Sequence, residues 1–79
     1  VHGWAVSAYL WRHNILPLAN AGYRVLAPDL PGHGLSDAPS APGSYSLDAF
    51  ARYVLETLDA CGVARAAVAG QSMGGKVVV

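Results

Sequence analysis

The chain has 79 residues, of which 53% are hydrophobic and 13% are charged, and its formal net charge at neutral pH is zero. This balance provides no basic face for nucleic acid and no charged run for an electrostatic partner. No segment approaches the ~18 uninterrupted apolar residues of a membrane-spanning helix. The single cysteine, Cys61, excludes an internal disulfide and a cysteine metal cluster, and its helix spacing indicates a small core residue. We expect a soluble globular chain without nucleic-acid or membrane partners; its compartment is left open, with the cytoplasm favoured.

The first motif in the chain is His2-Gly3-Trp4. A His-Gly pair that leaves a strand lets the next backbone N–H turn inward, where it can hold the developing negative charge of an acyl-transfer reaction. We expect the amide of Trp4 to be this oxyanion donor, and its side chain to face the acyl pocket. His2 is expected to fix the loop through hydrogen bonds rather than to serve as a catalytic base.

A first helix is predicted over about residues 8–21. Gly22 can end this helix in a left-handed conformation, and Pro17 is an internal flaw that should kink or divide it. Residues 23–27 are nearly free of polar side chains and are predicted to form a strand. The chain therefore begins with a helix followed by a strand.

A turn-rich loop follows, with the sequence Asp29-Leu30-Pro31-Gly32-His33-Gly34-Leu35-Ser36-Asp37. Asp29 and Asp37 are expected to bond to nearby backbone amides, and His33 to be structural. Residues 37–44 have the Pro, Ser and Gly content of a surface connection within one domain. His13 is expected to be exposed, and no pair of His or acidic residues has a recognised metal-ligand spacing. We expect no metal and no cofactor.

The second predicted helix has Ser46 as its N-cap and ends at Gly62. Asp48 favours its first turn, and apolar residues recur at three- and four-residue steps, which gives one face for packing on a sheet. Residues 66–69 form a second predicted strand that is nearly free of polar side chains. Such strands are typical of a parallel sheet covered by helices on both faces. The pattern predicts an α/β fold.

The last motif, Gly70-Gln71-Ser72-Met73-Gly74, follows this strand and leads into a predicted helix. It is a G-x-S-x-G nucleophile elbow in a strand-turn-helix setting. Gly70 and Gly74 give the room that a sharp, strained turn requires. We expect Ser72 to be the nucleophile and the amide of Met73 to be an oxyanion donor.

Together these three motifs resemble the α/β-hydrolase family over essentially the whole chain, in its serine-nucleophile, esterase-like branch. The run from His2 to Arg12 is also similar to the branch with epoxide hydrolases and haloalkane dehalogenases. Those enzymes place Asp at the elbow, where this chain has Ser72. A carboxylate nucleophile forms an alkyl-enzyme ester, whereas a serine forms an acyl-enzyme. We therefore expect a serine hydrolase rather than an epoxide hydrolase or a dehalogenase.

The resemblance implies that residues 1–79 form a partial α/β-hydrolase domain, from the oxyanion loop through the nucleophile elbow. Both ends are expected to be cut, with a central strand ending at Val1 between the two predicted strands. In the family the acid and the histidine of the triad follow the serine. No acidic residue or histidine follows Ser72 here, so the chain alone is expected to be inactive.

The expected reaction is hydrolysis of a carboxylic ester or related small-molecule acyl substrate through an acyl-enzyme at Ser72. One alternative is an acyltransferase or a cofactor-free haloperoxidase, which uses the same serine elbow. Another is a non-hydrolytic receptor or interaction protein on the same scaffold. Substrate, acceptor and oligomeric state are left open.

Overall fold

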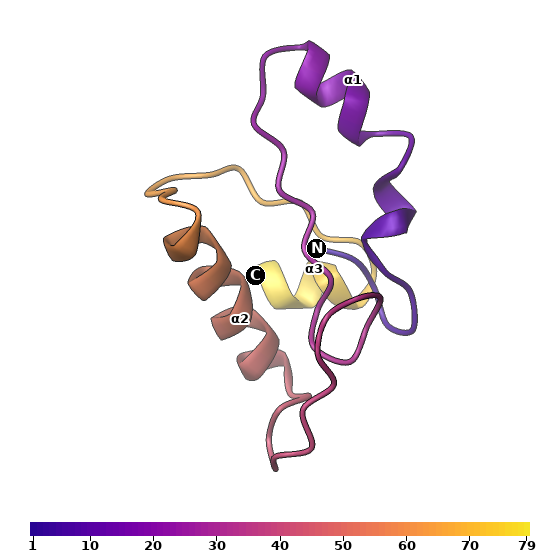
Figure 1. Ribbon diagram of the computed structural model, residues 1–79, viewed down its shortest axis with the longest axis vertical. Coiled ribbons are helices and arrows are strands. Elements are labelled where there is room, and N and C mark those ends of the chain that lie inside the picture. The colour runs from indigo at the N-terminus through magenta and orange to yellow at the C-terminus, as the bar shows by residue number, and fades with distance from the viewer.

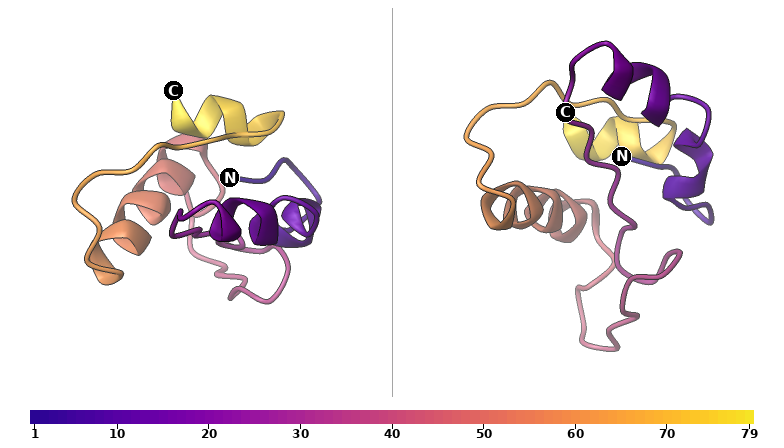
Figure 2. Two further views of the ribbon diagram at one scale, coloured as in Figure 1. Left: turned by 90° about the horizontal axis from the view of Figure 1, so that it is seen from above. Right: turned by 45° about the horizontal axis from the view of Figure 1, so that its top comes forward.

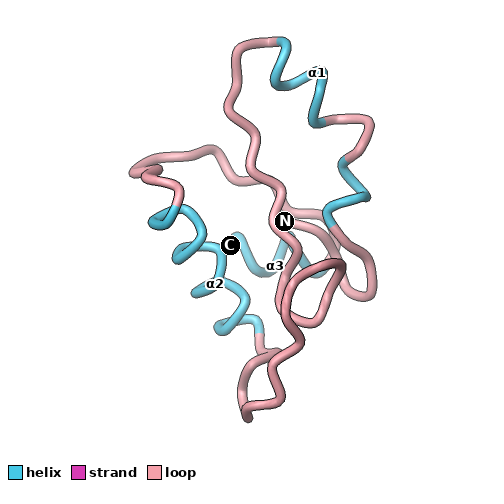
Figure 3. The backbone as a smooth tube through the Cα atoms, in the orientation of Figure 1, coloured by secondary structure: helices cyan, strands magenta, loops and turns pink.

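The computed structural model describes residues 1–79 and contains helices joined by loops, without a strand (Figures 1 and 3). In chain order the helices are a 3₁₀ helix, η1 (Ala8–Trp11), and three α-helices, α1 (Ile15–Asn20), α2 (Leu47–Ala60) and α3 (Met73–Val78). α2 and α3 lie against each other, whereas α1 lies at one end of the long axis (Figures 1 and 2). None of these helices is long and apolar enough to cross a membrane.

The first predicted helix is divided in the structure. The Ser7 hydroxyl accepts a hydrogen bond from the Tyr9 N–H at 3.3 Å where η1 begins, and α1 starts only after a turn at residues 12–14. The division falls before Pro17 rather than at it. Pro17 lies in the first turn of α1, where a residue needs no N–H donor. Gly22 has φ 97°, the left-handed conformation expected at the end of this helix.

The second predicted helix, α2, is confirmed. The Ser46 hydroxyl accepts a hydrogen bond from the Ala49 N–H at 3.0 Å, and Asp48 lies in the first turn. The helix ends shortly before Gly62, which has φ 71°. Its apolar face brings Phe50, only 1% exposed, into the core. The cap and the apolar periodicity were therefore sufficient to define this helix.

The two predicted strands are not formed. Residues 23–27 and 66–69 are loops with mostly exposed side chains, and no ladder of hydrogen bonds joins them. The amino group of Val1 donates to the Ala69 carbonyl at 2.5 Å, and the Val1 carbonyl accepts from the Gln71 N–H at 3.0 Å. These two bonds match the pattern of one residue in a parallel pair, but a strand requires several such residues. The predicted parallel sheet is therefore not confirmed.

The buried core of the chain is small. Seven of the 79 residues are buried, and the large apolar ones are Leu30, Phe50 and Val77, which meet where α2 and α3 contact the turn-rich loop. Large hydrophobic side chains stay exposed elsewhere, including Tyr23 at 67% and Leu55 at 62%. Independent domains of this size ordinarily bury about 60% of the surface of the unfolded chain. The hydrophobic stabilisation within these 79 residues is correspondingly limited.

Asp29 connects the N-terminal segment to the turn-rich loop. One carboxylate oxygen accepts a hydrogen bond from the Ala8 N–H at 2.7 Å, and the other accepts from the Leu35 N–H at 3.0 Å. The Ser36 hydroxyl donates to the Asp29 carbonyl at 2.5 Å. The bonds from Ala8 and Leu35 lower the pKa of Asp29, because the ionised carboxylate accepts them more strongly. The bond to Leu35 is the local type predicted from the sequence, whereas the sequence does not predict the bond to Ala8.

Because few residues are buried, we expect the 79-residue chain on its own to unfold gradually on heating, without a cooperative transition. Far-ultraviolet circular dichroism of the purified chain measures this, and the helical signal should decline over a broad temperature range. A sharp, reversible melt would contradict the expectation.

A second prediction concerns Asp29 in the full-length protein. The pKa of Asp29 is lower in the folded protein than in the unfolded chain, so the ionised carboxylate stabilises the two loops at pH values above the ordinary aspartate pKa. This stabilisation is lost as pH falls through the lowered pKa of the folded protein. The amide NMR signals of Ala8 and Leu35 should therefore titrate with a midpoint below ~4, the ordinary value. In Asp29→Asn, which has the same shape, this titration should disappear. A midpoint at or above the ordinary value would show that the carboxylate does not hold these amides.

Candidate active site

Ser72 lies where the chain turns from the loop after Ala69 into α3. Its backbone has φ 53° and ψ −116°, a conformation that is unfavourable for a residue with a side chain. Strain of this kind costs about 1–3 kcal/mol and persists only where the surroundings enforce it. The residue is exposed and its hydroxyl caps no amide of α3. The turn thus presents a hydroxyl that is free to meet a ligand.

The turn around Ser72 depends on close backbone contacts at two glycines. A Cβ atom added at Gly70 would overlap the carbonyl of Gly74 and lie 2.6 Å from the Gly75 nitrogen. A Cβ atom added at Gly74 would overlap the Val1 carbonyl and lie 2.6 Å from the His2 carbonyl oxygen. Such distances to rigid backbone leave no room for any side chain. Both positions therefore require glycine, as the sequence motif predicts.

The N-terminal loop lies directly against Ser72. A Cβ atom added at Gly3 would lie 3.3 Å from the Ser72 Cβ and 2.6 Å from Gln71 Oε1. Gly3 is itself buried, and Val1 is joined to Ala69 and Gln71 by the two hydrogen bonds described above. The structure thereby brings together two motifs from opposite ends of the chain.

Two backbone donors next to this junction have no partner within the chain. Trp4 follows Gly3, Met73 follows Ser72, and no hydrogen bond in the chain engages either N–H. The N–H of Gly74, by contrast, donates to the Gln71 carbonyl at 2.9 Å. Free N–H groups beside a nucleophile are the type of donor that holds an oxyanion.

His2 is fully buried and uses both of its ring nitrogens. Nε2 accepts a hydrogen bond from the Leu30 N–H at 2.9 Å, so the proton is on Nδ1, which donates to the Gly3 carbonyl at 2.7 Å. These bonds anchor the loop before Trp4 to the start of the turn-rich loop. A histidine engaged in this way has no nitrogen left to accept a proton from Ser72.

The other acidic and histidine side chains do not converge on Ser72. His33 is buried and is hydrogen-bonded to the Pro31 carbonyl at 2.9 Å, whereas His13 is exposed. The remaining acidic residues lie on exposed positions of α2 and the loop: Asp37, Asp48, Glu56 and Asp59. No group of three or more His, Cys, Asp or Glu residues is placed to hold a metal ion. The described residues thus present a hydroxyl and two amide donors, without a base beside them.

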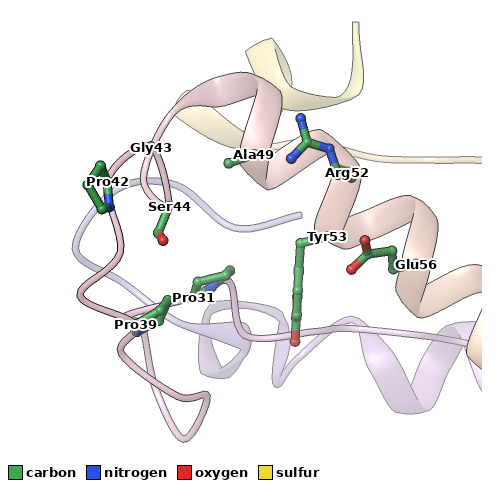
Figure 4. A pocket seen from close by; sticks show the side chains of 9 residues that line it. All are labelled: Pro31, Pro39, Pro42, Gly43, Ser44, Ala49, Arg52, Tyr53 and Glu56. Atoms are coloured by element: carbon green, nitrogen blue, oxygen red, sulfur yellow. The ribbon is translucent and has the colours of Figure 1, made fainter.

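Two shallow depressions border α2, and neither includes the residues around Ser72. One, of about 290 Å³, lies between the proline-rich part of the loop and α2 (Figure 4). The other, of about 520 Å³, shares Pro31, Pro39 and Tyr53 with it. In the close view Tyr53 projects from α2 toward the loop (Figure 4). The candidate site is therefore indicated by its backbone geometry, and neither of these two depressions contributes to it.

Comparison with known proteins identifies the family to which the sequence is similar. The sequence model of the family described as alpha/beta hydrolase fold matches residues 1–79. Epoxide hydrolase A of Mycobacterium tuberculosis is 43% identical over 77 residues, which cover 98% of this chain and 24% of that protein. The AB hydrolase superfamily protein YfhM of Bacillus subtilis is 38% identical over 77 residues, covering 98% of this chain and 27% of that protein.

A protein of Mycobacterium phage D29 named "Putative non-heme haloperoxidase" is 40% identical over 79 residues, which cover 100% of this chain and 28% of that protein. No solved structure matches the chain. The chain spans about a quarter of the length of these three relatives. Since the family matches every residue, and its members share about two-fifths of their aligned residues with it, the chain belongs to the α/β-hydrolase fold family.

Proposed function

We propose that this chain carries the nucleophile and both oxyanion donors of a serine hydrolase that acts on carboxylic esters or related acyl compounds. The observation that carries the proposal is the strained backbone of Ser72, packed against the buried Gly3 with a free N–H on either side of the junction. In this proposal residues 1–79 are the part of an α/β-hydrolase domain that runs from the oxyanion loop through the nucleophile elbow.

The proposed reaction has two stages. Ser72 Oγ attacks the carbonyl carbon of the substrate, and its proton passes to a base supplied by another part of the protein, because none of the histidines here bonds to Ser72. The N–H groups of Met73 and Trp4 hold the tetrahedral oxyanion. Its collapse breaks the bond to the alcohol, which takes up the proton. Water then attacks the acyl-enzyme, releases the acid and restores the Ser72 hydroxyl.

The identity of the nucleophile distinguishes this proposal from the activity named for the epoxide hydrolase relatives. A serine oxygen that opened an epoxide would form an ether, and water does not hydrolyse an ether under these conditions. A carboxylate that opened an epoxide would form an ester, which can be hydrolysed. Ser72 is therefore suited to acyl chemistry and would be trapped by epoxide chemistry.

A second candidate function is supported by the relative from Mycobacterium phage D29, whose name describes a non-heme haloperoxidase. Haloperoxidase or acyl-transfer chemistry on this scaffold would use the same serine ester and would differ only in what accepts the acyl group. Comparing hydrolysis with acyl transfer to hydrogen peroxide, alcohols or thiols distinguishes these functions. The first step, acylation of Ser72, is common to all of them.

We expect a fluorophosphonate probe to label Ser72 covalently in the full-length protein, because the probe reacts with an activated serine hydroxyl. Ser72→Ala should abolish labelling, whereas Ser40→Ala, at an exposed loop position, should leave it unchanged. Mass spectrometry locates the adduct. An adduct on another residue, or no adduct on folded protein, would favour a receptor that binds without forming an acyl-enzyme.

A further prediction separates the backbone of Trp4 from its side chain. Trp4→Phe keeps the N–H and should retain most of the activity, whereas Trp4→Pro removes the N–H and should lower kcat by about a hundredfold. Steady-state hydrolysis of a p-nitrophenyl ester by the two full-length variants measures the difference. The control is that the two variants have the same melting temperature. Equal kcat values for two variants that are equally stable would exclude the Trp4 amide as an oxyanion donor.

A further inference from the structure

His33 lies between the exposed Trp4 and the buried core. The Trp4 and His33 rings are in an edge-to-face contact, with centroids 5.4 Å apart and an interplanar angle of 78°. On its other side His33 meets Phe50 in a similar arrangement, at 6.0 Å and 79°. Trp4 is 63% exposed, whereas His33 is 7% exposed. His33 is therefore the link between an exposed residue of the N-terminal loop and the core.

The His33 ring is itself fixed in place. Its Nδ1 is 2.9 Å from the Pro31 carbonyl, which can only accept, so Nδ1 carries the proton and donates it. The His2 ring lies 4.9 Å away, centroid to centroid. A side chain held by a hydrogen bond and by two rings provides a rigid surface for Trp4.

The turn that contains Trp4 requires such support. Ala5 has φ 60°, a left-handed conformation that a residue other than glycine adopts at a cost. Residues 4 and 5 form a tight turn, and no short, well-aligned hydrogen bond engages the backbone of residues 4–6. The edge-to-face contact of the Trp4 ring with His33 is available to hold this turn and, with it, the backbone of Trp4.

We propose that His33 is a positioning residue: by holding the Trp4 ring it holds the strained turn at Ala5, and so aims the Trp4 N–H at the oxyanion formed on Ser72. The proposal rests on the proposed function, because it assigns His33 a role in that reaction. His33 makes no contact with substrate in this role and transfers no proton.

The test compares two replacements of His33 in the full-length protein. His33→Leu fills the space but offers Trp4 no ring, whereas His33→Phe keeps an aromatic ring, slightly larger than imidazole, and loses the bond to Pro31. In p-nitrophenyl acetate hydrolysis, His33→Leu should lower kcat about tenfold or more with KM within about twofold, since small displacements of a catalytic group are costly. His33→Phe should recover most of the lost kcat.

Tyr45→Ala provides a matched control. Tyr45 packs edge-to-face against Phe50 at 6.4 Å on the same core but makes no aromatic contact with Trp4. The Tyr45→Ala variant should lower the melting temperature to a similar extent as His33→Leu, and it should leave kcat of the folded enzyme unchanged. Equal losses of kcat in Tyr45→Ala and His33→Leu would mean that His33 only stabilises the core, which would overturn the proposal.

Ser72→Ala in the same assay distinguishes a failure of the proposed function from a failure of the role proposed for His33. If Ser72→Ala is inactive and His33→Leu has the kcat of the unmodified protein, the role of His33 is refuted while the proposed function stands. If Ser72→Ala retains full turnover, the proposed function fails and the role assigned to His33 fails with it. Loss of activity in Ser72→Ala, together with a kcat-only defect in His33→Leu that His33→Phe rescues, supports both.

Discussion

The candidate site depends on the contact between the backbone of residues 1–3 and the turn around Ser72. Gly74 lies so close to the carbonyls of Val1 and His2 that a single methyl group would separate the two segments. The same contact places Gly3 beside Ser72. It also lets the amino group and the carbonyl of Val1 form hydrogen bonds to Ala69 and Gln71, which precede Ser72. Ser72 and the free N–H of Met73 come from one segment, and the free N–H of Trp4 comes from the other. The site therefore exists only when the ends of the chain are packed together.

This contact is combined with backbone strain at two non-glycine residues. Ser72 and Ala5 both have positive φ values, and each such conformation costs about 1–3 kcal/mol. That cost is comparable with the roughly 1.5–3 kcal/mol gained by burying one large apolar side chain, and the core contains few of them. The strained turns must consequently be held by specific contacts. Glycine at 70 and 74 and the N–H of Gly74 hold Ser72, and in our proposal the edge-to-face contact of His33 with Trp4 holds the turn at Ala5.

Local features were predictable from residue type and spacing, whereas the long-range placement of residues 1–3 beside Ser72 followed only from the family resemblance. The Ser46 cap and the requirement for glycine at 70 and 74 follow from short-range geometry, which residue type and spacing report directly. The bond from Ala8 to Asp29 and the packing of Trp4 on His33 join residues more than 20 positions apart, and no periodicity encodes such pairs. The predicted strands did not form, because apolar runs such as residues 66–69 become strands only through hydrogen bonds to neighbouring strands.

Two features of the candidate site have different structural origins: the placement of its free amides and the type of side chain at position 72. The placement of the two free amides depends on the packing of distant segments, and it changes only if that packing changes. In the proposed reaction the covalent intermediate depends on the side chain at position 72, since a serine oxygen forms an ester with an acyl group, whereas a carboxylate oxygen forms an ester with an alkyl group. The relatives with about 40% identity to this chain have names as different as epoxide hydrolase and haloperoxidase, so the overall similarity of the sequences does not by itself identify the reaction.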